Sequence, residues 1–296
     1  MTNTLNQPKQ FTRKDIQQQV TDTIIQQLEK GTIPWKQPWK GTGLPVNYTT
    51  GNKYRGVNVL LLWSSAIQNE FTSMEWGTFK QWTGKDETIR KGEKGSLIVY
   101  YDTFEKEVDG EMKNIPFLKS SIVFNKCQLN SYQKPELINL DNAGLTTTVK
   151  AIDEFVENTK ATIQHSYLGA CYNPSQDKIY MPYPEYFEDT NTCTATEGYY
   201  STLLHELTHW TGGKDRIERT KGKKFEDVNY ALEELVAEMG AAFLCSEFGI
   251  ETLEKEDHSG YIAYWLKVLK DNKQCIFTAS SEASKAVDFL HGLQPQ

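Results

Sequence analysis

The stretch that decides the fold is an H-E-x-x-H pattern set among good helix formers, Leu203-Leu204-His205-Glu206-Leu207-Thr208-His209-Trp210. We expect a helix over 196–212, on which His205 and His209 lie one turn apart and project from the same face. Two imidazoles placed in this way can each give one nitrogen to a zinc ion. Glu206 points beside that axis, where its carboxylate could take a proton from a water. Chance is the alternative explanation, but the whole chain has only 5 His.

A third metal ligand is expected on the next helix, predicted over 230–249, because a catalytic zinc site takes three protein ligands. Glu234 and Glu238 share a face of that helix beside small residues, and Glu233 lies about 100° away. We therefore expect Glu234 to bind the metal and Glu238 to accept a ring N–H from a liganding histidine. Glu233 stays open as an alternative ligand, and Asp215 and Glu226 in the intervening loop are weaker ones.

The chemistry of such a site is hydrolysis of a polarised carbonyl, most naturally of a peptide bond, with Glu206 as the base. Zn²⁺ is the expected cofactor, and another divalent ion such as Mn²⁺ is possible. The strand predicted at 178–181, just before the catalytic helix, could pair with an extended peptide as an edge strand. A DNA-cleaving hydrolase is less favoured, since nucleases usually gather carboxylates around two metals.

Length and composition indicate a soluble globular protein of two domains. The chain has 296 residues, of which 38% are hydrophobic and 24% charged, and no apolar stretch is long enough to cross a membrane. Its polar first residues do not form a secretory signal. The 5 Cys are scattered without a C-x-x-C pair, which is typical of reduced thiols in a cytoplasm. We therefore expect a cytoplasmic protein with no membrane partner.

The two halves differ in charge and in their predicted elements. Residues 1–130 carry 17 basic and 13 acidic side chains, a net of +4, whereas residues 131–296 carry 15 and 26, a net of -11. A polar segment without periodicity separates them, so we expect domains at 1–130 and 145–296 with a linker at 131–144. Periodicity predicts an α+β fold. The expected helices are 13–30, 58–68, 76–82, 145–160, 196–212, 230–249, 258–270 and 281–290, and the expected strands are 97–101, 120–125, 163–165, 169–172 and 177–182.

The mildly basic first half offers the parts of a single-stranded nucleic-acid interface, because bases stack on aromatic rings while Lys and Arg follow the phosphates. An equally open alternative is that its aromatic residues belong to the core, which we favour for Trp63, Trp76 and Trp82. The candidate DNA-binding residues are Trp35, Lys36, Trp39, Lys40, Tyr54, Arg55, Arg90, Lys91 and Lys94.

Motifs in both halves resemble the ArdC-type antirestriction proteins. In the second half these are His205-Glu206-Leu207-Thr208-His209-Trp210-Thr211-Gly212 and Glu233-Glu234-Leu235-Val236-Ala237-Glu238. In the first half they are Pro34-Trp35, Tyr54-Arg55-Gly56-Val57-Asn58, Trp76-Gly77-Thr78-Phe79-Lys80-Gln81 and Arg90-Lys91-Gly92-Glu93-Lys94-Gly95.

This resemblance implies a single-stranded-DNA-binding domain followed by a zincin-like, gluzincin-type metallopeptidase domain. It also implies a protein of a mobile element that protects incoming DNA from host restriction. The competing hypothesis is a non-catalytic DNA-binding protein whose metal site is structural or vestigial. The presence of Glu206 favours an enzyme, because a purely structural site has no use for a base.

Overall fold

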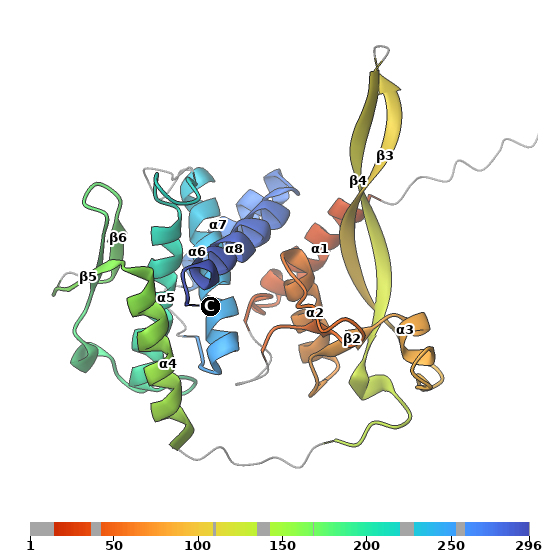
Figure 1. Ribbon diagram of the computed structural model, residues 1–296, viewed down its shortest axis with the longest axis horizontal. Helices are drawn as coiled ribbons and strands as arrows, with labels where there is room; N and C mark the ends of the chain where they lie inside the picture. Colours follow the sequence, from red (N-terminus) through yellow and green to blue (C-terminus); the bar gives the residue numbers. More distant parts are fainter. Residues whose placement is uncertain are drawn as a thin grey trace, which may run out of the picture.

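Helices and two small sheets follow one another along the chain as an α+β protein requires (Figure 1). The computed structural model describes residues 15–36, 43–108, 111–134, 143–167, 169–219, 228–252 and 258–295. None of the helices in these ranges combines the length and apolar character needed to cross a membrane. The α+β expectation is therefore confirmed.

The first half is built on a sheet in the order β1-β2-β4-β3. Its long strands, β3 and β4, pair from Ser96↔Val123 to Val108↔Glu111 and stand out from the body as a ribbon (Figure 1). The strands expected here were much shorter, and the helix expected over 76–82 is divided between β2 and α3. The elements are α1 (Ile16–Glu29), β1 (Val46–Asn47), α2 (Val57–Gln68), β2 (Glu75–Gly77), α3 (Phe79–Thr83), β3 (Ser96–Val108), β4 (Glu111–Asn125) and η1 (Lys126–Gln128).

The second half places a small sheet, in the order β5-β7-β6, beside a group of helices. β7 is the central strand, because it pairs with β5 on one side and with β6 on the other. The expectation that 178–181 is an edge strand open to a peptide is therefore wrong, and β5 and β6 are the two edge strands of the described sheet. The elements are α4 (Ala143–Thr159), β5 (Thr162–His165), β6 (Cys171–Asn173), β7 (Lys178–Met181), η2 (Pro184–Tyr186), α5 (Ala195–Thr211), α6 (Val228–Phe248), α7 (His258–Asp271) and α8 (Cys275–Gly292).

Helix α5 carries the H-E-x-x-H stretch and begins at a capping box. The Thr194 hydroxyl accepts a hydrogen bond from the backbone N–H of Glu197, and the Glu197 carboxylate accepts one from the backbone N–H of Thr194. These bonds satisfy backbone donors that a helix start leaves without partners. The helix ends at Thr211, with Gly212 as its C-cap. The cap thus fixes where the helix starts and with it the rotational position of the two histidines.

Helix α6 is the central helix of the second half and lies very close to α5. Gly240 permits this approach: a Cβ atom at that position would lie 2.5 Å from Cγ2 and 2.8 Å from Oγ1 of Thr208. Thr208 is itself fully buried on α5, where its hydroxyl donates to the carbonyl of Leu204. The absence of a side chain at one position therefore sets the distance between the helices that carry the expected metal ligands.

The two halves share one hydrophobic core. Trp35 packs edge-on against Trp265 of α7 with ring centroids 5.1 Å apart, and Trp63 of α2 packs against Phe243 of α6 at 5.8 Å. The side chain of Trp35 is only 3% exposed. Its expected role as an exposed stacking platform for bases is therefore wrong, because the ring fills the junction between α7 and the first half. Residues 135–142 of the expected linker lie outside the described residues.

Candidate metal centre

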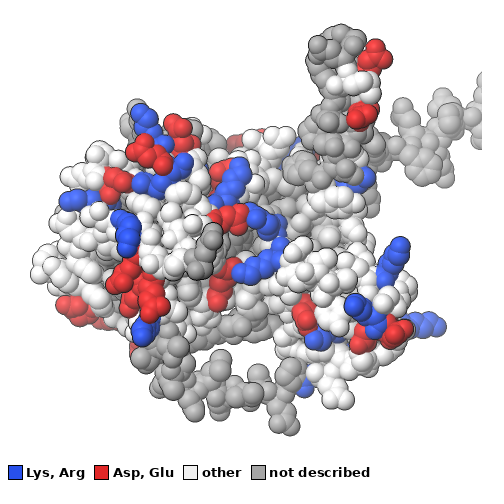
Figure 2. Space-filling model, viewed as in Figure 1, with Lys and Arg blue, Asp and Glu red and all other residues white. Residues whose placement is uncertain are grey.

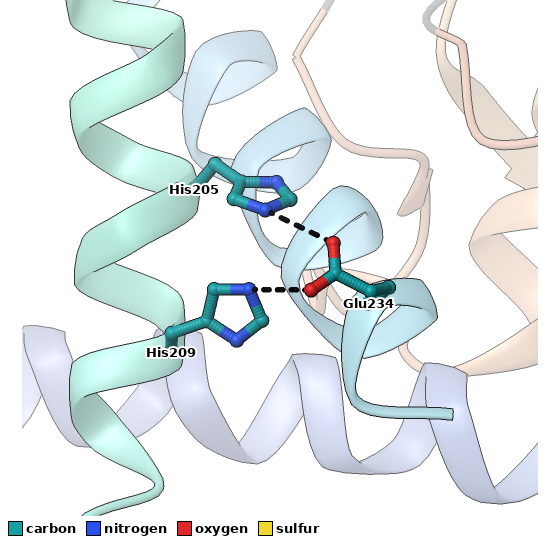
Figure 3. A group of neighbouring side chains, drawn as sticks. All are labelled: His205, His209 and Glu234. Atoms are coloured by element: carbon teal, nitrogen blue, oxygen red, sulfur yellow. Dashed lines mark ion pairs between the residues drawn. The ribbon is translucent and has the colours of Figure 1, made fainter. Parts of the chain in front are cut away.

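Three side chains from two helices meet at a buried point between α5 and α6. His205 and His209 extend from α5 and Glu234 from α6, with the carboxylate lying between the two rings (Figure 3). Nε2 of His205 is 3.6 Å from Oε2 of Glu234, and Nε2 of His209 is 3.4 Å from its Oε1. All three residues are less than a tenth exposed. The residue types and positions are those that the sequence predicted.

The spacing of these atoms fits a single divalent metal ion. One ligand atom from each residue lies within 4.8 Å of the others. A tetrahedral zinc site with bonds of about 2.1 Å has ligand atoms about 3.4 Å apart. The two measured nitrogen-to-oxygen distances are close to that value, so little movement is needed to bring the donors onto one ion. We conclude that this cluster is a divalent-metal site.

A second carboxylate holds His209 from the other side of its ring. Nδ1 of His209 lies 3.1 Å from Oε1 of Glu233. The guanidinium of Arg219 forms a bidentate contact with the Glu233 carboxylate, in which Nε donates to Oε2 and Nη2 to Oε1, each at 2.9 Å. The Arg219 side chain is only 5% exposed and also donates to the carbonyl of Thr208. A buried chain of contacts therefore runs from Arg219 through Glu233 to the histidine and fixes the orientation of its ring.

Glu238 lies beside the other histidine, with its Oε1 3.7 Å from Nδ1 of His205. That distance brings the charges together but is too long for a hydrogen bond. The expectation that Glu238 accepts a ring N–H thus remains a prediction, whereas Glu233 makes the closer ring contact. Glu233 was considered only as an alternative ligand. The sequence signal that could have pointed to this role is that Glu233 directly precedes Glu234. Two consecutive carboxylates can approach the ring of His209 from different sides.

The electrostatics of the site keep both of these carboxylates charged. Burial alone would raise the pKa of Glu234, but hydrogen bonding to His205 and His209 holds that pKa well below its ordinary value. Burial is likewise outweighed at Glu233, where His209 and Arg219 lower the pKa to about 2. Burial of His209 opposes its protonation, yet Glu233 and Glu234 raise its pKa to about 9. Without a metal, the two carboxylates therefore favour a protonated His209, and a metal ion that binds there would take the place of that proton.

Glu206 is held at the edge of the small sheet. Its Oε2 accepts a hydrogen bond of 2.7 Å from the backbone N–H of Tyr172 in β6. Arg216 in turn fixes this strand, because it donates to the Tyr172 hydroxyl at 2.9 Å and to Asp177 at 2.5 Å. The guanidinium of Arg216 also lies 4.1 Å from the ring centroid of Trp210 on α5. Glu206, the edge strand β6 and the metal-binding helix α5 are thus tied to one another.

The candidate DNA-binding residues do not gather in one place. Arg55 pairs with Asp288 of α8, and Tyr54 is partly buried, with its hydroxyl 3.4 Å from Nδ2 of Asn47. Arg90 donates to Glu93 and to the carbonyls of Cys127 and Leu129, so it fastens a turn to the chain after β4. Lys91 and Lys94 are exposed, and Lys36 is partly buried. Trp39 and Lys40 lie outside the described residues.

The loop after α5 and β6 supplies the contacts that sequence reasoning did not find. Arg219, Arg216 and the N–H of Tyr172 belong to no motif and follow no periodicity. A main-chain donor leaves no trace in a sequence. The two arginines could have been noticed only as basic side chains in a short loop between two ligand-bearing helices.

The fold and the site together define a zincin-like metallopeptidase domain. A protein-family model with that description matches residues 150–282, which include all three ligands and Glu206. A second model, described as the N-terminal domain of the anti-restriction factor ArdC, matches residues 14–124.

The chain belongs to the ArdC family of antirestriction proteins. It is 38% identical to ArdC of plasmid R388, whose metal-free crystal structure superposes with a TM-score of 0.79 over 94% of this chain and 97% of that one. The Mn(II)-bound structure of the same protein gives 37% identity, a TM-score of 0.77 and coverage of 94% and 98%. The expected family is therefore confirmed.

Two further relatives differ from each other in length. The uncharacterized protein y4eC of Sinorhizobium fredii is 33% identical over 296 residues, which cover 96% of this chain and 94% of that protein. The DNA primase TraC of Escherichia coli is 32% identical over 298 residues, which cover 94% of this chain but 27% of the primase. Most of this chain thus corresponds to about a quarter of the length of that primase.

Proposed function

We propose that this protein counters restriction of incoming DNA by hydrolysing a peptide bond at the metal site while its first half holds single-stranded DNA. The observation that carries the peptidase assignment is the position of Glu206. Its carboxylate is held by the Tyr172 N–H at the edge of a sheet, on the same helix as the ligands His205 and His209. A site that only stabilised the fold would not need a base there.

Each part of the site has its own role in the proposed peptide hydrolysis. A bound zinc or manganese ion would polarise the substrate carbonyl and lower the pKa of an attacking water. Glu206 is placed to take the proton from that water and later to return it to the leaving amine. β6, rather than the central β7, offers backbone groups to an extended peptide. The burial of the ligands restricts the access of other water.

The test of this proposal is the substitution Glu206→Gln, because the amide oxygen can still accept the Tyr172 N–H while the base is lost. Peptide hydrolysis should fall by about 10²–10⁴-fold. Metal content should stay at the parent level. Protection is measured as the efficiency of plasmid conjugation into restricting and non-restricting recipients. If the variant keeps its metal and protects as well as the parent, peptide hydrolysis is not the protective mechanism, and the binding-protein hypothesis takes its place.

The metal assignment has its own test. We expect Glu234→Ala to lose most of the metal measured by elemental analysis after gel filtration, because one of the three ligands is removed. Glu238→Ala should retain most of it, since its carboxylate lies 3.7 Å from Nδ1 of His205, whereas Glu234 faces Nε2 of both histidines. The reverse order would mean that Glu238 is the third ligand.

For single-stranded DNA we propose a surface around α3, which we call the α3 surface and define as Phe79, Lys80, Lys85, Lys91 and Lys94. Phe79 is 59% exposed, and the four lysines are also exposed. Basic side chains gather over the part of the molecule that holds α3, with acidic ones among them (Figure 2). An exposed ring beside lysines provides both base stacking and phosphate contacts.

We expect Phe79→Ala and the double substitution Lys80→Ala/Lys85→Ala each to weaken binding of a labelled oligothymidine. Loss of the ring should weaken it by about 1–3 kcal/mol at constant salt. Loss of the lysines should also reduce the dependence of the dissociation constant on salt concentration. Tyr186→Ala, an exposed aromatic residue of the other half, is the matched control. Salt-insensitive binding, or equal losses in the control, would contradict this location.

A further inference from the structure

A group of stacked aromatic side chains lies at the C-terminal ends of β5 and β7, and the metal chemistry does not use it. We call it the tyrosine cluster and define it as His165, Tyr167, Tyr183, Tyr186 and Tyr199. The ring of Tyr183 lies between those of His165 and Tyr167, with both centroid distances 5.3 Å. Tyr186 is 6.0 Å from Tyr167, and Nε2 of His165 is 3.0 Å from the hydroxyl of Tyr199. The cluster is a connected surface rather than a set of isolated rings.

Exposure of this cluster is unusual for aromatic side chains. Tyr167 is 77% exposed and Tyr186 is 60% exposed, whereas Tyr183 is partly buried. The ring of Tyr183 lies 5.3 Å from that of Tyr167 and 6.4 Å from that of Tyr186, so it holds the two exposed rings in place. Exposed aromatic patches with a defined arrangement mark contact surfaces.

The cluster borders the proposed substrate path. Tyr199 and Glu206 lie on the same stripe of α5, two turns and about 10 Å apart. Tyr167 of the cluster is four residues before Cys171, which begins the edge strand β6. The N–H of the next residue, Tyr172, donates to Glu206 at 2.7 Å. An extended peptide advances about 3.3 Å per residue. A side chain bound at the cluster would thus be roughly three residues from the peptide bond beside Glu206.

The charge around the cluster is acidic. Between residues 178 and 196 the charged side chains are Lys178, Glu185, Glu188 and Asp189. Glu185, Glu188 and Asp189 are exposed in or just after η2, next to Tyr186. Lys178 begins β7, at the end of that strand opposite to the cluster. Rings with negative faces beside carboxylates favour a cation and repel the phosphates of a nucleic acid.

From this juxtaposition we propose that the tyrosine cluster binds an arginine or lysine side chain of an extended peptide, so that the metal site acts on basic polypeptide segments. This inference rests on the proposed peptidase function and names the substrate class. It also gives the two halves a common target. Proteins that bind DNA carry such segments, because lysine and arginine neutralise the phosphates.

Peptide binding to the metal-free full-length chain in EDTA tests the proposal separately from catalysis. The probes are fluorescein-labelled peptides of equal length, one alternating arginine with glycine and one with citrulline in place of each arginine. Fluorescence anisotropy at low salt should show the arginine peptide binding about tenfold more tightly. Tyr167→Ala and Tyr186→Ala should each remove most of that preference. Tyr186→Phe should keep it, because a phenyl face also attracts cations.

The matched control is Tyr100→Ala, which removes a 47% exposed tyrosine from β3 and should leave binding unchanged. Equal binding of the two peptides, or an unaltered preference in the tyrosine variants, would overturn the proposal. Preferential binding of an oligothymidine at the cluster would overturn it as well. His205→Ala should abolish hydrolysis but keep the arginine preference, so failure of the peptidase assignment and failure of the cation site give different results.

Discussion

At the scale of single residues, the metal site depends on a side chain that binds no metal. Arg219 and Glu233 are both buried, and together they hold Nδ1 of His209 while its Nε2 faces Glu234. An imidazole fixed at one nitrogen presents the other in one direction and in one tautomer. Arg219 is therefore a positioning residue, acting on the ligand through Glu233.

We expect Glu233→Gln and Arg219→Lys to lower metal affinity by about 10–100-fold. Lysine is a useful replacement at position 219 because it keeps the positive charge but cannot form the bidentate contact with Glu233. Affinity is measured by competition with a chelator, and circular dichroism confirms that the variants fold. Glu238→Gln is the comparison, since its 3.7 Å contact should matter less. Equal losses in the Glu233 and Glu238 variants would show that the Arg219 chain of contacts has no special role.

Residues within one helix could be placed from the sequence, whereas residues that meet across the fold could not. Helical spacing put His205, Glu206 and His209 in the correct relation because all three belong to α5. Trp35 was a candidate for base stacking, with the core as an equally open alternative, and the partner that places it in the core, Trp265, is far away in the sequence. Local composition carries no information about such a partner.

At the scale of elements, the site exists because α5 and α6 approach closely at Gly240. We expect Gly240→Ala to destabilise the fold by about 1–3 kcal/mol, because the new methyl would overlap Thr208. Metal affinity should fall with it. Chemical denaturation and chelator competition measure the two effects.

Two further variants test whether overlap with Thr208 causes the loss of stability and of metal affinity. Adding Thr208→Ala to Gly240→Ala should restore part of both properties, since it removes the atoms that the methyl meets. Gly292→Ala at the end of α8 adds the same methyl where no atom outside the adjacent helix backbone lies within 4 Å, and should be almost neutral. A Gly240→Ala chain as stable as the parent would disprove the close-approach argument.

The elements themselves were largely predictable, and their spatial order was not. Apolar periodicity located α6 over 230–249, close to its observed bounds of Val228–Phe248. The same reasoning found the strand at β7 but made it an edge. In so short a strand, alternation shows which side chains are buried but not whether one or both edges are paired. The pairing partners, β5 and β6, decide that in three dimensions.

At the scale of the whole molecule, Glu247 of α6 links the two halves. Its carboxylate is 2.6 Å from Nζ of Lys53 in the first half and 2.6 Å from Nε2 of His291 on α8. Burial alone would raise the pKa of Glu247, but hydrogen bonds from His291 and Lys53 lower it from 4.5. Because the pKa of Glu247 is lower in the folded protein than in the unfolded chain, its ionised carboxylate stabilises the fold above about pH 4.5. This stabilisation is lost as the pH falls further and the carboxylate becomes protonated.

We therefore expect Glu247→Gln to be less stable than the parent near neutral pH and to lose less stability on acidification. Melting temperatures measured from pH 7 down to about pH 2 should converge below about pH 4.5, as the parent carboxylate becomes protonated. Glu282→Gln, which breaks an ion pair within α8 alone, is the control and should track the parent curve. A constant difference between the Glu247→Gln variant and the parent across that range would contradict the linkage.

Because the metal ligands lie on two different helices, a bound ion would stabilise the fold as well as serve any catalysis. An ion that joins α5 to α6 binds the folded chain and not the unfolded one, so it would add about 2.7 kcal/mol of stability at a hundred times its dissociation constant. His205, His209 and Glu234 would then be advantageous in a chain that never hydrolysed a peptide, because the ion would act as a clasp between helices. The clasp needs nothing from Glu206, whose carboxylate meets the Tyr172 N–H instead. Glu206 is therefore the residue that distinguishes a catalytic metal site from one that only joins two helices.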